Sequence, residues 1–109
     1  MISVHHLDYN AISHEDRLKI TCNADVKTIS ENLYGNYDFV AEVDTDSMDV
    51  AYEKTNNIEE SWVNNDGVYV NEAFKGGARS TSVGDLLICG RDMFIVDHFG
   101  FTPLRKNRK

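Results

Sequence analysis

The stretch RSTSVGD at residues 79–85, with the apolar run LLICGRDMFIVDHFGF that follows it at residues 86–101, decides the predicted fold. A hydroxyl-rich turn ends at a Gly-Asp pair and leads directly into the densest hydrophobic sequence of the chain, as a loop before a core β-hairpin does. Residues 86–89 and 93–96 are apolar at successive positions, so both predicted strands should be covered on both faces. Gly90-Arg91 suits the two-residue turn between them.

At the C-terminal end of this hairpin, Gly100 is expected to break or bulge the last strand before Phe101 and Leu104 return to the core. Pro103 should be confined to an edge position. The last five residues, 105–109, hold four basic side chains. A chain of 109 residues is large enough for one core but too small for two. We therefore predict one globular domain over residues 1–104, with a basic tail at 105–109.

Upstream of the hairpin, further strands follow from apolar alternation and β-branched residues. Residues 2–7 and 37–43 alternate, and residues 18–22 (LKITC) are rich in β-branched side chains, so each is predicted to be a strand. A strong turn signal at 64–67 precedes a short predicted strand at 68–70. One face of strand 37–43 is expected to hold Tyr37, Phe39, Ala41 and Val43.

Two helices complete the predicted domain. One should begin after a cap at Asn23 or Asp25 and run through Leu33, and the other should cover residues 48–56. The expected fold is α+β, with a mixed or mostly antiparallel sheet and about two helices packed on one side. Curling of that sheet into a small partial barrel is left open.

The charge of the chain is strongly acidic and unevenly distributed. Its formal net charge is −7, which disfavours nucleic acid and anionic membranes as partners. Residues 38–60 contain one lysine, Lys54, among eight acidic residues. These are Asp38, Glu42, Asp44, Asp46, Asp49, Glu53, Glu59 and Glu60. A solvated acidic face is the simplest interpretation.

The sequence lacks several patterns that would indicate a cellular compartment or a cofactor. Cys22 and Cys89 have neither CxxC spacing nor a secreted disulfide pattern, so free thiols in the cytoplasm are expected. No apolar run approaches ~18 residues, and we expect no membrane segment. His5 and His6 are adjacent on a predicted strand and should point to opposite faces, so no metal site is predicted. No cofactor is expected, and the hydroxyl-rich turn does not fit the P-loop pattern.

Two polar blocks are the candidate binding residues. The first comprises Thr55, Asn56, Trp62 and Asn65, and the second comprises Arg79, Ser80, Thr81 and Ser82. The second block could hold a phosphate or carboxylate. The structural alternatives are a core role for the tryptophan, capping and turn roles for the asparagines, and pairing of the arginine with Asp85 while the hydroxyls bond to the loop backbone.

Three sequence blocks carry a resemblance. They are AYEKTNNIEESWVNN at 51–65, RSTSVGDLLI at 79–88 and VDHFGF at 96–101. In this order they resemble a group of small uncharacterised proteins encoded by bacteriophages, plasmids and related mobile elements. The resemblance implies a phage or mobile-element origin and no particular chemistry. The matching positions are Thr55, Asn56, Trp62, Asn65, Arg79, Ser80, Ser82, Gly84, Asp85, Gly100 and Phe101.

The leading functional hypothesis is a non-enzymatic phage accessory protein, an interaction module that uses the two polar blocks to bind a protein or a small anionic ligand. The alternative is an acidic mimic of nucleic acid that blocks a host DNA-binding protein. Direct binding of nucleic acid through Arg79 and the basic tail is disfavoured by the net charge. An enzyme is the weakest class, because the sequence has neither a nucleophile elbow nor a cysteine-histidine signature.

Overall fold

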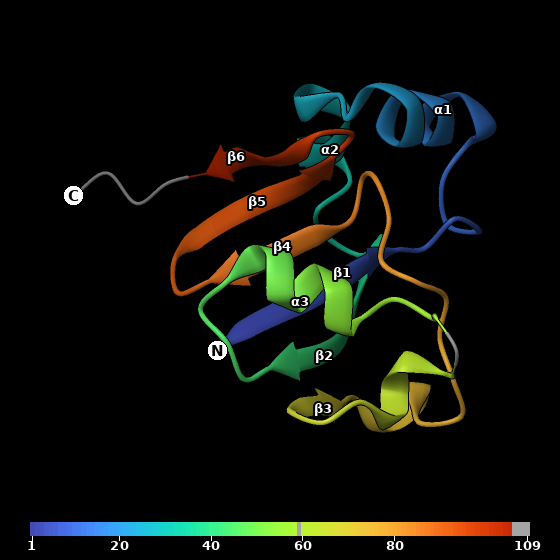
Figure 1. Ribbon diagram of the computed structural model, residues 1–109. Helices are drawn as coiled ribbons and strands as arrows, with labels where there is room; N and C mark the ends of the chain where they lie inside the picture. Colours follow the sequence, from blue (N-terminus) through green and yellow to red (C-terminus); the bar gives the residue numbers. More distant parts are fainter. Residues whose placement is uncertain (59, 106–109) are drawn as a thin grey trace.

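The computed structural model describes residues 1–58 and 60–105 of the chain (Figure 1). Within these residues lies a six-stranded antiparallel sheet in the order β3-β2-β1-β4-β5-β6. Its strands are β1 (Ile2–Leu7), β2 (Tyr37–Val43), β3 (Val68–Val70), β4 (Leu86–Cys89), β5 (Asp92–Asp97) and β6 (Gly100–Arg105). The predicted α+β class is confirmed, and this sheet is open rather than closed into a barrel, with β3 and β6 at its edges.

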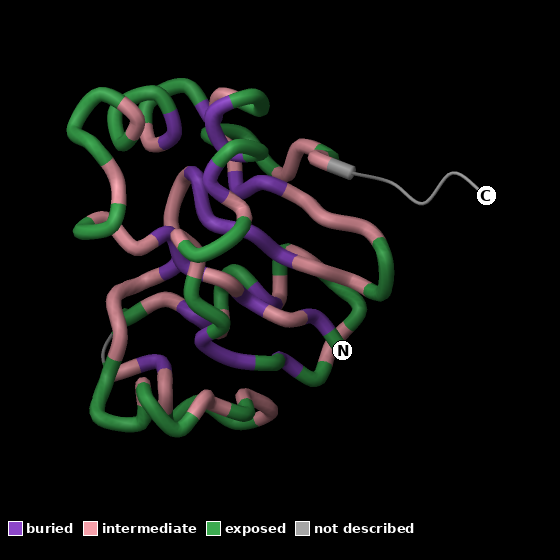
Figure 2. The backbone as a smooth tube through the Cα atoms, turned by 180° about the vertical axis from the view of Figure 1, so that it is seen from behind, coloured by how far each residue is buried: buried purple, intermediate pink, exposed green. Residues whose placement is uncertain are grey.

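Helices lie on both faces of the sheet, which corrects the prediction of two helices on one side. The described chain contains α1 (His14–Asn23) and α2 (Val26–Glu31) on one face and α3 (Met48–Lys54) on the other (Figure 1). Short 3₁₀ turns occur at Trp62–Asn64 and Glu72–Phe74. The reason is the central hairpin of β4 and β5. Its neighbouring residues Leu86 and Leu87, and likewise Ile95 and Val96, point to opposite faces of the sheet and are all buried, so each face needs a cover (Figure 2).

Two hydrophobic cores result, one on each face. The α3-side core consists of Ile2, Val4, Val40, Ala41, Val43, Ala51, Trp62, Leu87 and Val96. The α1/α2-side core consists of Leu7, Ile20, Ala24, Ile29, Leu86 and Ile95. The neighbouring pairs Leu86/Leu87 and Ile95/Val96 therefore divide between the two cores.

The predicted strand at residues 18–22 is wrong, because this segment belongs to α1. Ser13 caps the helix by accepting a hydrogen bond from the Asp16 N–H at 3.1 Å, and Glu15 and Asp16 place negative charge in the first turn. Ile20 is buried in the α1/α2-side core, whereas Leu18 is exposed. Capping and the burial of Ile20 outweigh the β-propensity of the segment.

A β-bulge changes the expected face of β2. Val4 pairs with Ala41 and His5 pairs with Phe39, which leaves Val40 as the extra residue. Val40 and Ala41 therefore both enter the α3-side core. The predicted apolar face is divided: Ala41 and Val43 stay in that core, Tyr37 packs against the α1/α2-side core, and Phe39 is exposed.

The C-terminal hairpin agrees with the sequence pattern. Cys89 pairs with Asp92 across the Gly90-Arg91 turn, and Gly90 has a φ of 63°. β6 is an edge strand that begins at Gly100 and contains Pro103. Of the predicted basic tail, residues 106–109 lie outside the described residues.

Candidate functional site

The two predicted polar blocks meet in space between the end of α3 and the start of β4. The Thr81 N–H donates to the Thr55 carbonyl at 2.9 Å. The Trp62 Nε1–H donates to the Arg79 carbonyl at 2.8 Å, and the Asn57 N–H donates to the Ser80 hydroxyl at 2.7 Å. We call residues 55–58, 60–65 and 78–85, joined by these bonds, the polar clasp.

The arginine of the clasp is paired with Asp85. Arg79 donates from Nη1 to Oδ2 of Asp85 at 2.7 Å and from Nη2 to Oδ1 at 2.8 Å, and the Asp85 side chain is fully buried. Asp85 also accepts from the backbone N–H groups of Leu7 and Ser82. Burial alone would lower the pKa of Arg79. The hydrogen bonds to Asp85 and the negative charge of Asp85 have the larger opposite effect, so the pKa of Arg79 is raised. The guanidinium is thus a fixed, neutralised charge.

A buried chain of hydroxyl groups links β1 to α3 through the clasp. His6 Nε2 lies 2.8 Å from the Thr81 hydroxyl, which donates to the Thr55 hydroxyl at 2.7 Å, and Thr55 donates to the Ala51 carbonyl at 2.8 Å. Because the Thr81 proton is already donated, His6 must carry a proton on Nε2. Burial lowers the pKa of His6 to about 4, so the ring is neutral at pH 7.

The remaining candidate side chains of the first block also have partners within the protein. Asn56 donates its amide to the Tyr52 carbonyl, and Asn65 donates its amide to the Lys54 carbonyl at 2.8 Å, so both satisfy carbonyls at the end of α3. Trp62 is fully buried, and its ring lies edge-on to that of His6 with 6.1 Å between the ring centres. These are the structural roles that the sequence left open, and a ligand-binding role for the two blocks stays a prediction.

The outer side of the clasp offers little to an anion. The ring of Tyr9 makes cation–π contacts with two guanidinium groups, those of Arg17 at 4.2 Å and Arg79 at 4.3 Å from the ring centre. The adjoining hollow of about 290 Å³ is lined by Arg79 but also by the carboxylates Asp8 and Asp38. With Arg79 already neutralised by Asp85, these acids dominate the charge around the hollow.

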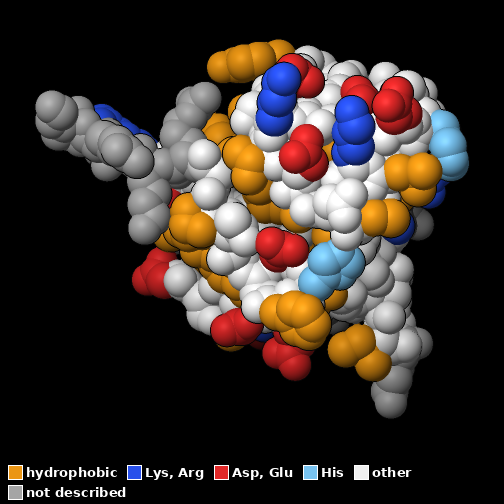
Figure 3. Space-filling model, turned by 90° about the horizontal axis from the view of Figure 1, so that it is seen from above, with side chains coloured by type: hydrophobic (Ala, Val, Ile, Leu, Met, Phe, Trp, Pro, Cys, Tyr) orange, Lys and Arg blue, Asp and Glu red, His pale blue; other side chains and the backbone are white. Residues whose placement is uncertain are grey.

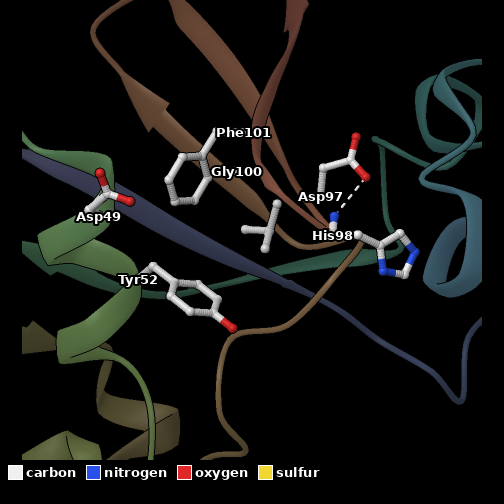
Figure 4. A pocket seen from close by; sticks show the side chains of 7 residues that line it. Asp49, Tyr52, Asp97, His98, Gly100 and Phe101 are labelled. Atoms are coloured by element: carbon white, nitrogen blue, oxygen red, sulfur yellow. Dashed lines mark hydrogen bonds between the residues drawn. The ribbon is translucent and has the colours of Figure 1, made fainter.

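A different pocket, which the sequence did not indicate, lies between α3 and the turn that joins β5 to β6 (Figure 4). We call it the α3–β6 pocket. Its volume is about 150 Å³, and it is lined by Asp49, Tyr52, Val96, Asp97, His98, Gly100 and Phe101. The spacing of Asp49 and Tyr52 along the predicted helix, and the closing VDHFGF block, are visible in the sequence. Only the packing of α3 over β5 and β6 brings the two segments together.

One acidic group of this pocket, Asp97, is held in a defined position. Asp97 accepts hydrogen bonds from the Thr102 hydroxyl and from the His98 N–H, both at 2.8 Å, and these bonds lower the pKa of its carboxyl group. The His98 ring points away, with Nε2 at 2.7 Å from the Cys22 carbonyl (Figure 4). Asp97 therefore lines one end of the pocket as a carboxylate that the β5–β6 turn holds in place, and Asp49 lies at the other end on α3 (Figure 4).

Two general features concern the described part of the chain. Across residues 1–58 and 60–105, no group of three or more His, Cys, Asp or Glu side chains is arranged to hold a metal ion. In the same ranges, no helix combines the length and the apolar character needed to cross a bilayer.

Compared with protein-family models, curated proteins and solved structures, the chain matches none of them.

Proposed function

We propose that this protein is a non-enzymatic interaction module that binds a basic surface of a partner protein. The observation that carries the proposal is a set of exposed acidic side chains around α3, which we call the α3 acidic face: Asp44, Asp46, Asp49 and Glu53. Asp49 and Glu53 are four residues apart on α3 and share one side of it. Within the described chain, only Asp46 of these four forms an ion pair, with the N-terminal amine at 3.6 Å.

The opposite end of the molecule has a different charge pattern. On the face that carries α1 and α2, acidic and basic side chains lie among one another (Figure 3). Lys19 and Glu15 pair there at 3.8 Å. Largely unpaired negative charge on one face and mixed charge on another favour an oriented encounter with a basic partner.

The groups that could support catalysis have structural partners instead, which supports a binding role. The neutral His6 ring ends a hydrogen-bonded chain, and Arg79 and Asp85 neutralise each other. The same pairing argues against a small anionic ligand at Arg79. A basic protein surface is the partner class that remains favoured.

The resemblance of residues 51–101 to phage and mobile-element proteins supports a partner in the cytoplasm of a host cell. Mimicry of nucleic acid is the second candidate, favoured by the net charge of −7. The bulge of β2 weakens the case for mimicry. Because of the bulge, Asp38, which pairs with His6, and Glu42, which pairs with Ser3, lie on opposite faces of the sheet. The acidic residues of the segment are therefore not in one row.

The proposal is tested by two charge-matched triple variants. Asp44→Asn, Asp46→Asn and Glu53→Gln remove charge from the α3 acidic face, whereas Glu15→Gln, Glu31→Gln and Glu72→Gln remove the same charge from exposed acids elsewhere. We expect immobilised wild type and the second variant to retain the same basic host protein, in a salt-sensitive manner, and the first variant to lose it. Equal retention by both variants would contradict the proposal. Competition by duplex DNA for the retained protein would favour mimicry.

A further inference from the structure

We propose that the α3–β6 pocket receives one basic side chain, an arginine or a lysine, from the partner protein. The inference rests on the proposed function and names the contact by which the partner would be recognised. It is carried by the combination of a concave pocket, two aromatic walls and two carboxylates at Asp49 and Asp97.

The aromatic walls come from different elements. Tyr52 projects from α3 and Phe101 from β6, and their rings lie edge to face with 6.2 Å between centres (Figure 4). Val96, which is buried in the α3-side core, also lines the pocket. Such a lining accepts the apolar stem of a long side chain, and a ring face attracts the cation at its end.

The charge of the pocket selects a cation. Asp49 and Asp97 are its carboxylates, and among the described residues no lysine or arginine lines it. Asp97 is held by Thr102 and the His98 N–H, so it does not have to reorganise when a ligand enters. A guanidinium or ammonium group in the pocket would be attracted by the negative charge of these acids, and an anion would be repelled by it.

The size of the pocket limits the ligand to a single side chain. Its volume of about 150 Å³ is smaller than the roughly 300–1,000 Å³ typical of pockets for drug-sized molecules. The pocket also adjoins the α3 acidic face through Asp49. A basic side chain of a docked protein fits this position, since the surrounding acids would attract the rest of the basic surface.

The inference is tested by NMR titration of the isotope-labelled protein with the peptide acetyl-Gly-Gly-Arg-Gly-Gly-amide. Matched titrations use the lysine peptide, the glutamine peptide and free L-arginine. We expect the arginine or the lysine peptide to shift the backbone amide signals of Tyr52, Val96 and Gly100, and the glutamine peptide to leave them unchanged. Shifts of equal size with the glutamine peptide, or none with either basic peptide, would overturn the inference. Tighter binding of free L-arginine would assign the pocket to a small cation and overturn it as well.

Variants separate the pocket from general charge. Asp49→Asn and Tyr52→Leu should each weaken binding of the basic peptide by about fivefold, which corresponds to a cation–π contact of about 1 kcal/mol for the tyrosine. Glu42→Gln and Tyr34→Leu alter an exposed acid and an exposed tyrosine elsewhere and should bind as wild type does. Unchanged binding in both pocket variants would contradict the inference.

The two proposals fail in different ways. If the triple variant of the α3 acidic face loses the partner while Asp49→Asn and Tyr52→Leu retain it fully, the interaction module stands and the pocket assignment falls. If the basic peptide binds the pocket but the host protein is retained by neither wild type nor variants, the pocket stands and the proposed function falls.

Discussion

Asp85 shows how one side chain organises distant parts of this protein. Its carboxylate accepts hydrogen bonds from the Arg79 guanidinium and from the backbone N–H groups of Ser82 and Leu7. Arg79 also donates to the Leu7 carbonyl at 2.9 Å, so the ion pair fixes the end of β1 against the clasp. The pairing of Asp85 with Arg79 could be predicted from the sequence, because the two residues are only six positions apart. The bond to Leu7 could not be predicted, because it depends on how the strands pair in the sheet.

We expect Asp85→Asn to lower the free energy of unfolding by about 3–5 kcal/mol, because it leaves a partly buried guanidinium without its charge partner. Urea denaturation followed by circular dichroism measures this change. Asp46→Asn is the control, since the Asp46 side chain is 95% exposed and its loss should change stability by less than about 0.5 kcal/mol. A similar small effect at Asp85 would refute a structural role for the pair.

The buried His6 should make stability depend on pH. Its folded-state pKa is lowered from 6.5 to about 4, mainly by burial. The charge of Asp85 opposes this lowering of the pKa, and the charges of Arg79 and His5 add to it. The unfolded chain therefore binds a proton more readily, and the stability of the folded protein falls as the pH decreases from about 6.5 to 4. The contribution of this residue is up to about 3 kcal/mol.

The comparison of wild type with His6→Gln isolates this contribution, because glutamine does not titrate while the carboxylates remain the same. We expect the variant to be less stable at pH 7, where a bond to Thr81 is altered, but to lose less stability between pH 6.5 and 4. Parallel pH profiles for the two proteins would show that His6 is not buried in its neutral form.

Among the elements, the packing of α1 against the start of β4 depends on Gly84. Its φ is +96°, and a Cβ atom there would lie 2.5 Å from the Ile20 Cγ2 atom. Tyr37 in β2 donates its hydroxyl proton to the Gly84 carbonyl at 2.6 Å. The glycine therefore has both a backbone and a packing reason to lack a side chain.

We expect Gly84→Ala to destabilise the protein by about 2–5 kcal/mol, combining the cost of a positive φ with the overpacking of Ile20. Gly35→Ala is the matched control: its φ of +93° is nearly the same, but no atom lies within 4 Å of the added Cβ. That variant should lose only about 1–2 kcal/mol. Thermal or urea unfolding of both variants measures the difference, and equal losses would contradict the packing of α1 on this turn.

The elements were predictable where local pattern and tertiary setting agree. The central hairpin follows from continuous apolar residues and Gly90-Arg91, and β2 has the bounds that alternation indicates. The segment Leu18–Cys22 misled because its β-branched residues lie on a capped helix of which only Ile20 enters the core. The bulge at Val40 has no local sequence signal and depends on the pairing of β1 with β2.

At the scale of the whole molecule, the topology decides which polar residues face solvent. The tertiary fold brings both polar blocks together, as a functional site would require, but most of their side chains are used in bonds to the protein itself. The same fold turns the acids of the β2–α3 segment outward and forms the α3–β6 pocket from segments that are far apart in the sequence. Sequence patterns mark residue types that serve either role, and only packing separates them.

The central claim is that the polar clasp holds the fold and the α3 acidic face binds the partner. Isothermal titration of the retained host protein into Arg79→Lys and into the α3 triple variant, both verified as folded, tests it most directly. We expect Arg79→Lys, though less stable because it loses the bidentate bond to Asp85, to bind with the wild-type affinity. The triple variant should keep its stability and lose at least tenfold in affinity. Full binding by the triple variant together with lost binding by Arg79→Lys would contradict the claim and return the binding role to the clasp.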